Sequence, residues 1–296
     1  MEQPVHVIGI TIYPKTAEDA AKLGAALPRL VEEDPTLAYG IDPEPEGARL
    51  IGTSETHLEL AIDRLIQGFG VQVSVRKFEI AYRETITKTV EHDYAHKKQT
   101  GGVGQFARVK IRFEPLPRES GFVFTNAADR ALPDEYATAV ADALRTAARR
   151  GGVHCYPTID FRATLIDGAY HDTDSNAQTF EAAARACFRE GTAKAGPQLL
   201  EPVMKVAVLT PEEFMGDVIG DLNGTGGSIS GMSRQDTMRA IDALVPLRHM
   251  LGYDSRLRAM TLGRGSWTTQ FDRYAPYWRG GDDLNPIHPG AAMGLR

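Results

Sequence analysis

The sequence predicts an α+β protein of three consecutive domains, because one pattern of elements occurs twice and a different segment lies between the copies. Residues 5–75 give strand and helix signals in the order β-α-β-β-α-β, and residues 204–271 repeat that order. This order is typical of the ferredoxin-like split motif. We therefore expect ferredoxin-like domains over residues 1–77 and 199–275, a middle domain over residues 78–198, and an irregular tail over residues 276–296.

The first domain is predicted from its periodicity and from its helix end signals. Residues 5–12 are apolar and β-branched, which indicates a strand. Thr16 followed by acidic residues favours a helix start, and Asp34-Pro35 favours its end. Ser54 begins a second stripe of apolar residues at helical spacing, which Gly68 ends. The other strands are expected at residues 37–42, 48–52 and 71–75.

The last domain follows the same order of elements. Residues 204–209 form an apolar strand pattern, and Thr210-Pro-Glu-Glu predicts a helix with Pro211 at its first position. The patterns that follow predict strands near 228–232 and 237–245, a helix near 254–262 and a strand at 267–271.

The middle domain has an order of its own. Alternation predicts one long strand over residues 82–90 and another over residues 108–113. A helical stripe over residues 133–150 is closed by Gly151-Gly152. A strand at residues 159–166, ending at Asp167-Gly168, and a helix at residues 175–195 complete this domain.

The composition is that of a soluble globular protein, with 42% hydrophobic and 24% charged residues among 296. No run approaches the roughly 18 apolar residues of a membrane span, and the start of the chain has no signal-peptide pattern. Two cysteines are too few for a disulfide framework and are not spaced as a zinc motif. We expect a cytoplasmic protein that does not associate with membranes.

The charge of the chain leaves nucleic-acid binding open. A net charge of -6 argues against it, because phosphate contacts usually come from Lys and Arg. Cations nevertheless gather locally, and such an edge on an acidic body can bind a phosphate backbone. They are equally compatible with ordinary solvated strands. These cations are Lys88, Lys97, Lys98, Arg108 and Lys110.

The loop Tyr-His-Asp-Thr-Asp-Ser at residues 170–175 has three competing interpretations. His171, Asp172 and Asp174 could bind a metal ion, although no distant His or Cys cluster completes the set. Asp174 or Ser175 could cap the following helix. His171 could instead stack on an RNA base and hydrogen-bond its edge while the loop backbone meets phosphate.

A second loop, Gln-Thr-Gly-Gly-Val-Gly-Gln at residues 99–105, joins two predicted strands. Its glycines permit left-handed conformations and close approach of a partner, and Lys97 and Lys98 precede it. The alternative is a flexible hairpin loop. It is not a phosphate-binding P-loop, because no Gly-Lys-Ser/Thr follows it, and no segment of the chain has that motif. The glycines are Gly101, Gly102 and Gly104.

Many short motifs, agreeing in order and spacing over roughly residues 5–275, resemble domains III, IV and V of the elongation factor G family of translational GTPases. The Lys-Lys-Gln-Thr form of the second loop looks more like the elongation-factor-G-like paralogues. The matching segments are Pro14-Lys15-Thr16, Glu33-Asp34-Pro35, Tyr82–Thr85, Gln99–Gln105, Gly168–Ser175, Leu199–Val206, Gly216–Leu222 and Leu251–Tyr253.

The resemblance implies a function as well as a fold. Domains III and V of the family are ferredoxin-like, and domain IV resembles domain 2 of ribosomal protein S5. The tip of domain IV enters the decoding region and meets tRNA and mRNA, while domain V lies near the ribosomal RNA of the large-subunit stalk base. The implied RNA-binding residues are His171, Asp172, Asp174, Ser175, Gly101, Gly102, Gly104, Gln105, Lys97, Lys98, Arg258 and Arg264.

The resemblance further implies the ribosome as partner, with no catalytic residue, metal or cofactor in this chain. GTP and Mg belong to the intact family, so hydrolysis would need a G domain and domain II on another part of the protein or on a separate polypeptide. The chain also departs from the family pattern. Gly52-Thr-Ser-Glu-Thr-His-Leu58 replaces Gly-Met-Gly-Glu-Leu-His-Leu, residues 224–227 lack the usual Arg-Arg pair, and a Gly/Pro-rich tail replaces the C-terminal helix.

These departures keep other functions open. The chain could be a stand-alone ribosome-binding factor without GTPase activity, one polypeptide of a split factor, or a fragment without function. A metal-dependent hydrolase that uses His171, Asp172 and Asp174 is the alternative of a different class.

Overall fold

The computed structural model describes residues 5–41, 47–100, 103–128 and 132–278. The chain divides into two compact units, Tyr82–Leu200 and the pair of segments Met1–Ala81 and Glu201–Arg296. We call them the middle unit and the outer unit. No helix in the described ranges has the length and apolarity that a membrane crossing requires. The domain boundaries expected at residues 77–78 and 198–199 stay predictions.

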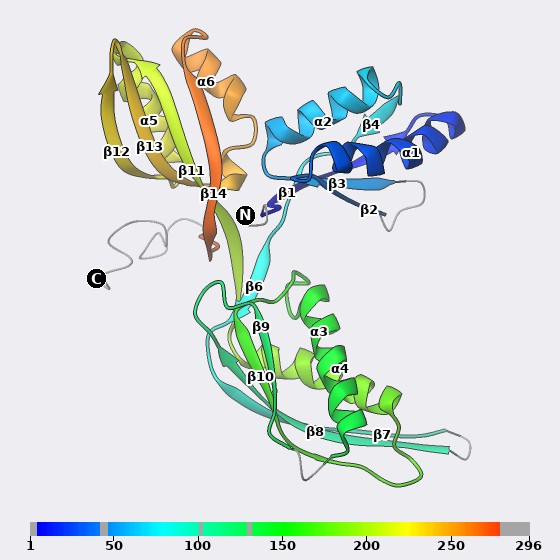
Figure 1. Ribbon diagram of the computed structural model, residues 1–296. Helices are drawn as coiled ribbons and strands as arrows, with labels where there is room; N and C mark the ends of the chain where they lie inside the picture. The colour runs from blue at the N-terminus through cyan, green and yellow to red at the C-terminus, as the bar shows by residue number, and fades with distance from the viewer. Residues whose placement is uncertain (1–4, 42–46, 101–102, 129–131, 279–296) are drawn as a thin grey trace. The chain divides into compact units, whose positions relative to one another are not determined.

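The first ferredoxin-like sheet has the strand order β2-β3-β1-β4, with two helices packed on one face (Figure 1). Ile8, Ile10 and Ile12 alternate along the central strand and are buried in a core with residues of both helices. Thr16 and Ser54 cap the helices as predicted, because their hydroxyls accept N–H bonds from Asp19 and His57. The elements are β1 (Ile8–Pro14), α1 (Ala17–Glu33), β2 (Ala38–Ile41), β3 (Ala48–Gly52), α2 (Glu55–Gln67), β4 (Val73–Val75) and β5 (Glu79–Ile80).

The last domain repeats this arrangement, with the strand order β12-β13-β11-β14. The predicted position of Pro211 is wrong. Pro211 ends a long strand, and the 3-10 helix η1 separates it from the following α-helix, so it is not the first residue of that helix. The elements are β11 (Pro197–Pro211), η1 (Glu212–Phe214), α5 (Met215–Gly224), β12 (Ser228–Gln235), β13 (Met238–Pro246), η2 (Leu247–His249), α6 (Tyr253–Thr261) and β14 (Ser266–Pro276).

The two equivalent strand orders confirm the predicted α+β fold class with a ferredoxin-like domain at each end of the chain. Strand β14 ends at Pro276, where the irregular tail was predicted to begin. Residues 279–296 of that tail lie outside the described residues.

The middle unit has a sheet of order β7-β8-β10-β9 with both helices on one face (Figure 1). Strands β9 and β10 are parallel neighbours, and the chain between them forms α3. Gly151 ends that helix at a φ of 94°, as the Gly-Gly pair predicts. The elements are β6 (Arg83–Ile86), β7 (Val90–Thr100), β8 (Val103–Pro115), β9 (Phe122–Asn126), α3 (Asp134–Arg150), β10 (Phe161–Ala169) and α4 (Ala177–Lys194).

The single long strand predicted over residues 82–90 is wrong, because the chain changes sheets there. Strand β6 pairs with β11, whereas β7 pairs with β8. Between them, the backbone N–H groups of Thr87 and Lys88 donate to carbonyl oxygens of Ala195 and Gly196 at 2.9–3.1 Å. The alternation of side chains continues through this break, so periodicity alone does not reveal it.

The predicted ends of β10 and α4 also need correction. Strand β10 extends to Ala169 through a β-bulge between Leu165 and Asp167. Helix α4 begins later than predicted, with Asn176 as its N-cap, because the Asn176 side chain accepts the backbone N–H of Thr179 at 2.9 Å. Neither Asp174 nor Ser175 is the helix cap.

Glu84, from the Tyr-Arg-Glu-Thr motif, connects β6 to the loop after α3. Its side chain is almost fully buried and accepts bonds from the backbone N–H groups of Gly152 and His154 and from the Thr158 hydroxyl. A buried carboxylate with three donors is satisfied, and removing it would leave those donors unpaired. This residue therefore stabilises the base of the middle unit.

Candidate nucleic-acid interface

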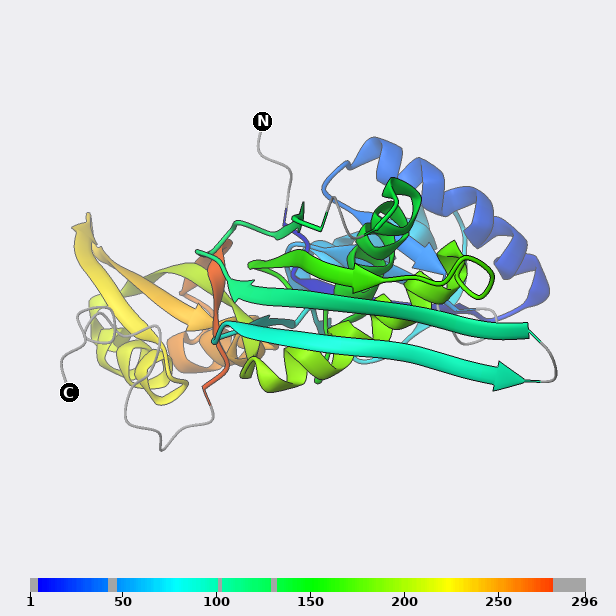
Figure 2. The same cartoon turned by 90° about the horizontal axis from the view of Figure 1, so that it is seen from below.

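The candidate interface is built on the long hairpin of β7 and β8, whose strands run side by side in Figure 2. Their register places Lys97 opposite Phe106 and Lys98 opposite Gln105. The hairpin ends at the glycine loop. Gly101 and Gly102 of the prediction lie outside the described residues, whereas Gly104 and Gln105 are in β8.

Hydrogen bonds join this hairpin to the loop between β10 and α4. The backbone N–H of Phe106 donates to the carbonyl oxygen of Asp174 at 2.9 Å. The Ser175 hydroxyl donates to the carbonyl oxygen of Phe106 at 2.6 Å and accepts the backbone N–H of His171 at 2.8 Å. The structure therefore brings the two predicted loops together, and Ser175 connects them instead of capping α4. We call the described residues 97–98, 104–106 and 170–176 the tip.

Close packing at the tip explains one glycine. A Cβ added to Gly104 would lie 2.7 Å from the carboxylate of Asp174, nearer than any real Cβ contact. Gly104 therefore makes room for Asp174, and the peptide of Asp174 is held by Phe106. Glycine is needed here for the close approach of a side chain rather than for a left-handed conformation.

His171 lies at the outside of the tip, with 60% of its side chain exposed. Its Nδ1 lies 3.0 Å from the Thr173 hydroxyl and 3.6 Å from a carboxylate oxygen of Asp174. Asp172 is exposed. Among the described residues, no three His, Cys, Asp or Glu side chains gather closely enough to hold a metal ion, so no observation favours the metal-dependent hydrolase.

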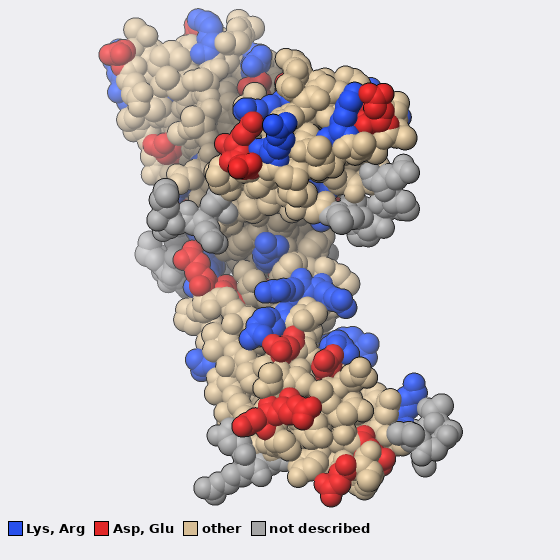
Figure 3. Space-filling model, turned by 45° about the vertical axis from the view of Figure 1, so that its right-hand side comes forward, with Lys and Arg blue, Asp and Glu red and all other residues tan. Residues whose placement is uncertain are grey.

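The cations of the hairpin divide into paired and exposed groups. Arg108 pairs with Asp93 and Asp167, and Lys110 and Arg112 both pair with Glu91. Their hydrogen bonds raise the pKa of Arg108 and Arg112 and lower that of Glu91. Figure 3 accordingly shows acidic and basic side chains mixed over the visible face.

The exposed cations are at the tip end of the hairpin. Lys98 is exposed, and Lys97 is exposed with its Nζ 5.7 Å from the centre of the Phe106 ring. Gln105 is exposed, and its Oε1 lies 3.4 Å from Nε2 of His96. The tip thus offers two cations, an amide and an imidazole to solvent.

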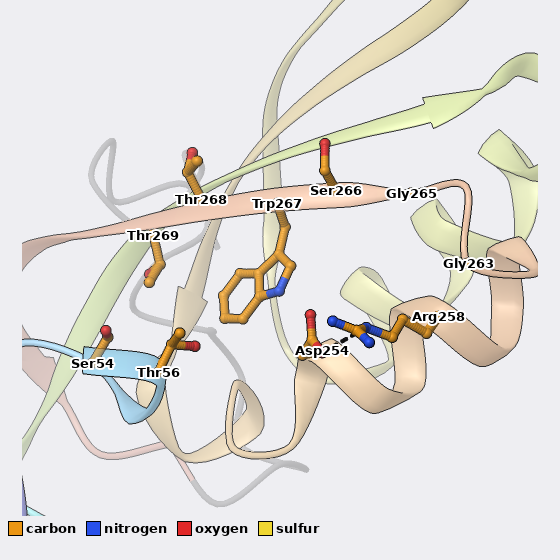
Figure 4. Close-up of a pocket in the computed structure, with 10 residues that line it drawn as sticks. All are labelled: Ser54, Thr56, Asp254, Arg258, Gly263, Gly265, Ser266, Trp267, Thr268 and Thr269. Carbon is orange, nitrogen blue, oxygen red and sulfur yellow. Dashed lines mark ion pairs between the residues drawn. The ribbon is translucent and has the colours of Figure 1, made fainter. Parts of the chain in front are cut away.

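Arg258 and Arg264 lie in the outer unit and not at the tip. Arg258 is 70% exposed, pairs with Asp254 at 2.8 Å and lines a cavity of about 570 Å³ (Figure 4). Arg264 pairs with Glu213 and lies 4.7 Å from the centre of the Phe214 ring. Both guanidinium groups are engaged by carboxylates within their own domain.

Sequence reasoning missed two residues of the tip, Thr173 and Phe106. Phe106 acts through its peptide group, which no side-chain pattern can reveal. Thr173 occupies a position that the family motif leaves open, so the motif gives no signal for it. Only the closed loop places it against His171.

Three family models match consecutive segments of the chain. Residues 3–77 match elongation factor G domain III, residues 78–196 match elongation factor G domain IV, and residues 198–279 match the elongation factor G C-terminus. Together these segments account for most of the chain, in the order of the family.

Individual proteins agree with this match. The chain is 47% identical over 275 residues to elongation factor G of Anaplasma marginale (strain Florida), which covers 93% of this chain and 40% of that protein. It is also similar to a crystal structure from Thermus thermophilus, with a TM-score of 0.71 and 36% identity over 94% of this chain and 42% of that one. The chain thus spans about two fifths of the length of these relatives. It belongs to the elongation factor G family and corresponds to domains III, IV and V, without the G domain.

Proposed function

We propose that this chain binds the ribosome in translation elongation and that its tip contacts tRNA and mRNA at the decoding region. The observation that supports this most is the joining of two loops, about 70 residues apart in sequence, into one exposed surface. Hydrogen bonds through Phe106 and Ser175 hold the imidazole of His171 and the ammonium groups of Lys97 and Lys98 on the same tip. We propose that Arg258 and Arg264 of domain V face ribosomal RNA of the large subunit.

The chemistry of the tip suits RNA better than a small substrate. An exposed imidazole can stack on a base and hydrogen-bond its edge, and the loop backbone can approach phosphate. Lys97 and Lys98 add charge that favours a phosphate backbone and makes binding sensitive to salt. Because the matched domains are the non-GTPase domains, this chain would hold neither GTP nor Mg. Both would bind a G domain elsewhere in the protein or on another polypeptide, in the cytoplasm with the ribosome.

The test is co-sedimentation of the purified chain with bacterial ribosomes at about 50 mM and about 200 mM salt. The double variant Lys97→Ala/Lys98→Ala should bind more weakly and lose roughly one power of salt dependence for each lysine. His171→Ala should weaken binding without changing the salt dependence, because it removes no permanent charge.

The matched control is Arg118→Ala/Arg189→Ala, which removes two exposed cations of the same unit away from the tip. Arg118 follows the far end of β8, about 40 Å along the strand from Gly104. The control should bind like the unmodified chain. Equal loss of binding in both double variants would mean that only general charge matters, and binding that ignores salt would contradict the proposal.

A further inference from the structure

We propose that Thr173 is a positioning residue, which holds His171 in the tautomer with its proton on Nε2. The tip then presents a fixed N–H donor to an acceptor atom of RNA, such as a phosphate oxygen, a ribose oxygen or an acceptor on a base edge. The identity of this partner rests on the proposed function. The choice of tautomer does not, because it follows from contacts within the chain.

Two groups of Thr173 face the same ring nitrogen. The Thr173 hydroxyl oxygen lies 3.0 Å from Nδ1 of His171, and the Thr173 backbone nitrogen lies 3.4 Å from it. A hydroxyl can donate or accept, but an amide N–H can only donate. Nδ1 must therefore be the acceptor. Since a neutral imidazole has one N–H, its proton is on Nε2.

Asp174 is the competing influence. One of its carboxylate oxygens lies 3.6 Å from Nδ1 and would favour a proton there. That distance is too long for a hydrogen bond, whereas both Thr173 contacts are shorter. Asp174 is also held in place by its peptide bond to Phe106 and by its packing over Gly104. Thr173 therefore determines the tautomer.

The loop leaves the other side of the ring available. The backbone of His171 is held twice, because its N–H donates to the Ser175 hydroxyl and its carbonyl accepts the Ser175 N–H at 3.1 Å. Within the described part of the chain, no group bonds Nε2 of this exposed side chain. A fixed Nε2–H is a donor only, so the tip selects acceptors and rejects groups that can only donate.

The direct test is the tautomer itself. In the full chain labelled with ¹⁵N-histidine, long-range ¹H–¹⁵N spectra distinguish a protonated from an unprotonated ring nitrogen. At about pH 8.5, two units above the ordinary histidine pKa, the neutral form dominates. His171→Gln identifies the signals of His171. The unmodified chain should show the proton on Nε2.

The decisive variants are Thr173→Val, which keeps the shape and removes the hydroxyl, and Thr173→Ser, which keeps the hydroxyl. Thr173→Val should lower the ratio of Nε2–H to Nδ1–H about fivefold, the equivalent of one hydrogen bond of about 1 kcal/mol. Thr173→Ser should restore the ratio. A proton on Nδ1 in the unmodified chain, or an unchanged ratio in Thr173→Val, would overturn the proposal.

Ribosome co-sedimentation of the same variants separates this proposal from the proposed function. Thr173→Val should bind more weakly than Thr173→Ser at equal salt. If the tautomer responds as expected but the unmodified chain does not bind ribosomes, the proposed function is wrong and the positioning role of Thr173 stands. If ribosomes bind and the tautomer does not respond, the reverse holds.

Discussion

At the scale of single residues, the two cysteines have opposite environments within the middle unit. Cys187 is fully buried in α4, and its thiol lies 3.6 Å from the carbonyl oxygen of His92, to which it donates. Burial raises the pKa of the Cys187 thiol from 9.0 to about 12, and the nearby carboxylates of Asp93 and Glu190 add to the shift. Cys155 is exposed.

We predict that an aromatic disulfide reagent modifies one thiol per native chain rapidly at pH 8. A pKa of about 12 instead of 9.0 leaves roughly a thousandfold less thiolate at Cys187, and burial excludes the reagent. Cys155→Ser should abolish the rapid phase, and denaturant should release one further thiol. Two thiols of equal rate in the native chain would contradict the buried position of Cys187.

The same shift gives a sign for stability against pH. The pKa of the Cys187 thiol is higher in the folded chain than in the unfolded chain, so the folded state favours the protonated thiol. Its contribution to the free energy of unfolding is fully present below about pH 9 and is lost as pH rises toward 12. Cys187→Ala should remove this alkaline dependence.

At the scale of elements, glycine within a helix has opposite consequences in α4 and α5. Gly191 is buried in α4 where an added Cβ would overlap the ring of Phe113. Gly191→Ala should lower the free energy of unfolding by about 1–3 kcal/mol, because overpacking displaces a buried ring. Thermal or denaturant unfolding measures this loss.

Gly220 is the matched control, since it lies in α5, is exposed, and has nothing within 4 Å of an added Cβ. Gly220→Ala should stabilise by about 0.5–1 kcal/mol through helix propensity and lower entropy of the unfolded chain. The same sign for both substitutions would show that propensity, and not the contact with Phe113, decides the outcome in α4.

Elements with local signals could be predicted from the sequence, and elements set by distant contacts could not. Thr16 and Ser54 cap helices because each precedes its own amphipathic stripe, and the two repeated strand orders follow from that regular pattern. The break at Thr87 depends on carbonyl groups of Ala195 and Gly196, more than 100 residues away. No local pattern contains that information.

The site shows the same division. The motifs identified His171, Ser175 and Gly104, and the structure brings them to one tip. The motifs did not reveal that Ser175 bonds the peptide of Phe106 while Asn176 caps α4. Both Asp174 and Ser175 are good capping residues by type, so the choice of cap was settled by the tertiary contact and not by propensity.

At the scale of the whole molecule, the chain contains separate reporters for its two units. Both of its tryptophans, Trp267 and Trp278, belong to the outer unit. Trp267 lies edge-on to Tyr253 with ring centres 5.1 Å apart, and the backbone N–H of Trp278 donates to Glu201. Cys187 belongs to the middle unit. Tryptophan fluorescence and release of the Cys187 thiol therefore follow different units.

We predict that Gly191→Ala lowers the temperature at which the Cys187 thiol becomes reactive by several degrees and leaves the tryptophan transition within about 1 °C. The reason is that each unit has its own hydrophobic core and can unfold as a separate cooperative body. Glu181→Ala, which removes one exposed ion pair of α4, should leave both transitions nearly unchanged. Equal shifts of both transitions in Gly191→Ala would mean that the chain unfolds as one body.

The division of the outer unit into two segments also sets an order for synthesis. The middle unit is continuous in sequence, whereas the outer unit needs residues from both sides of it. Strand β6 finds its partner in the first residues of β11, so the middle unit can close only when Leu200 has left the translating ribosome. At that moment the second ferredoxin-like sheet has not been made. The newborn chain must therefore keep its first segment folded or protected through more than a hundred further residues before the outer unit is complete.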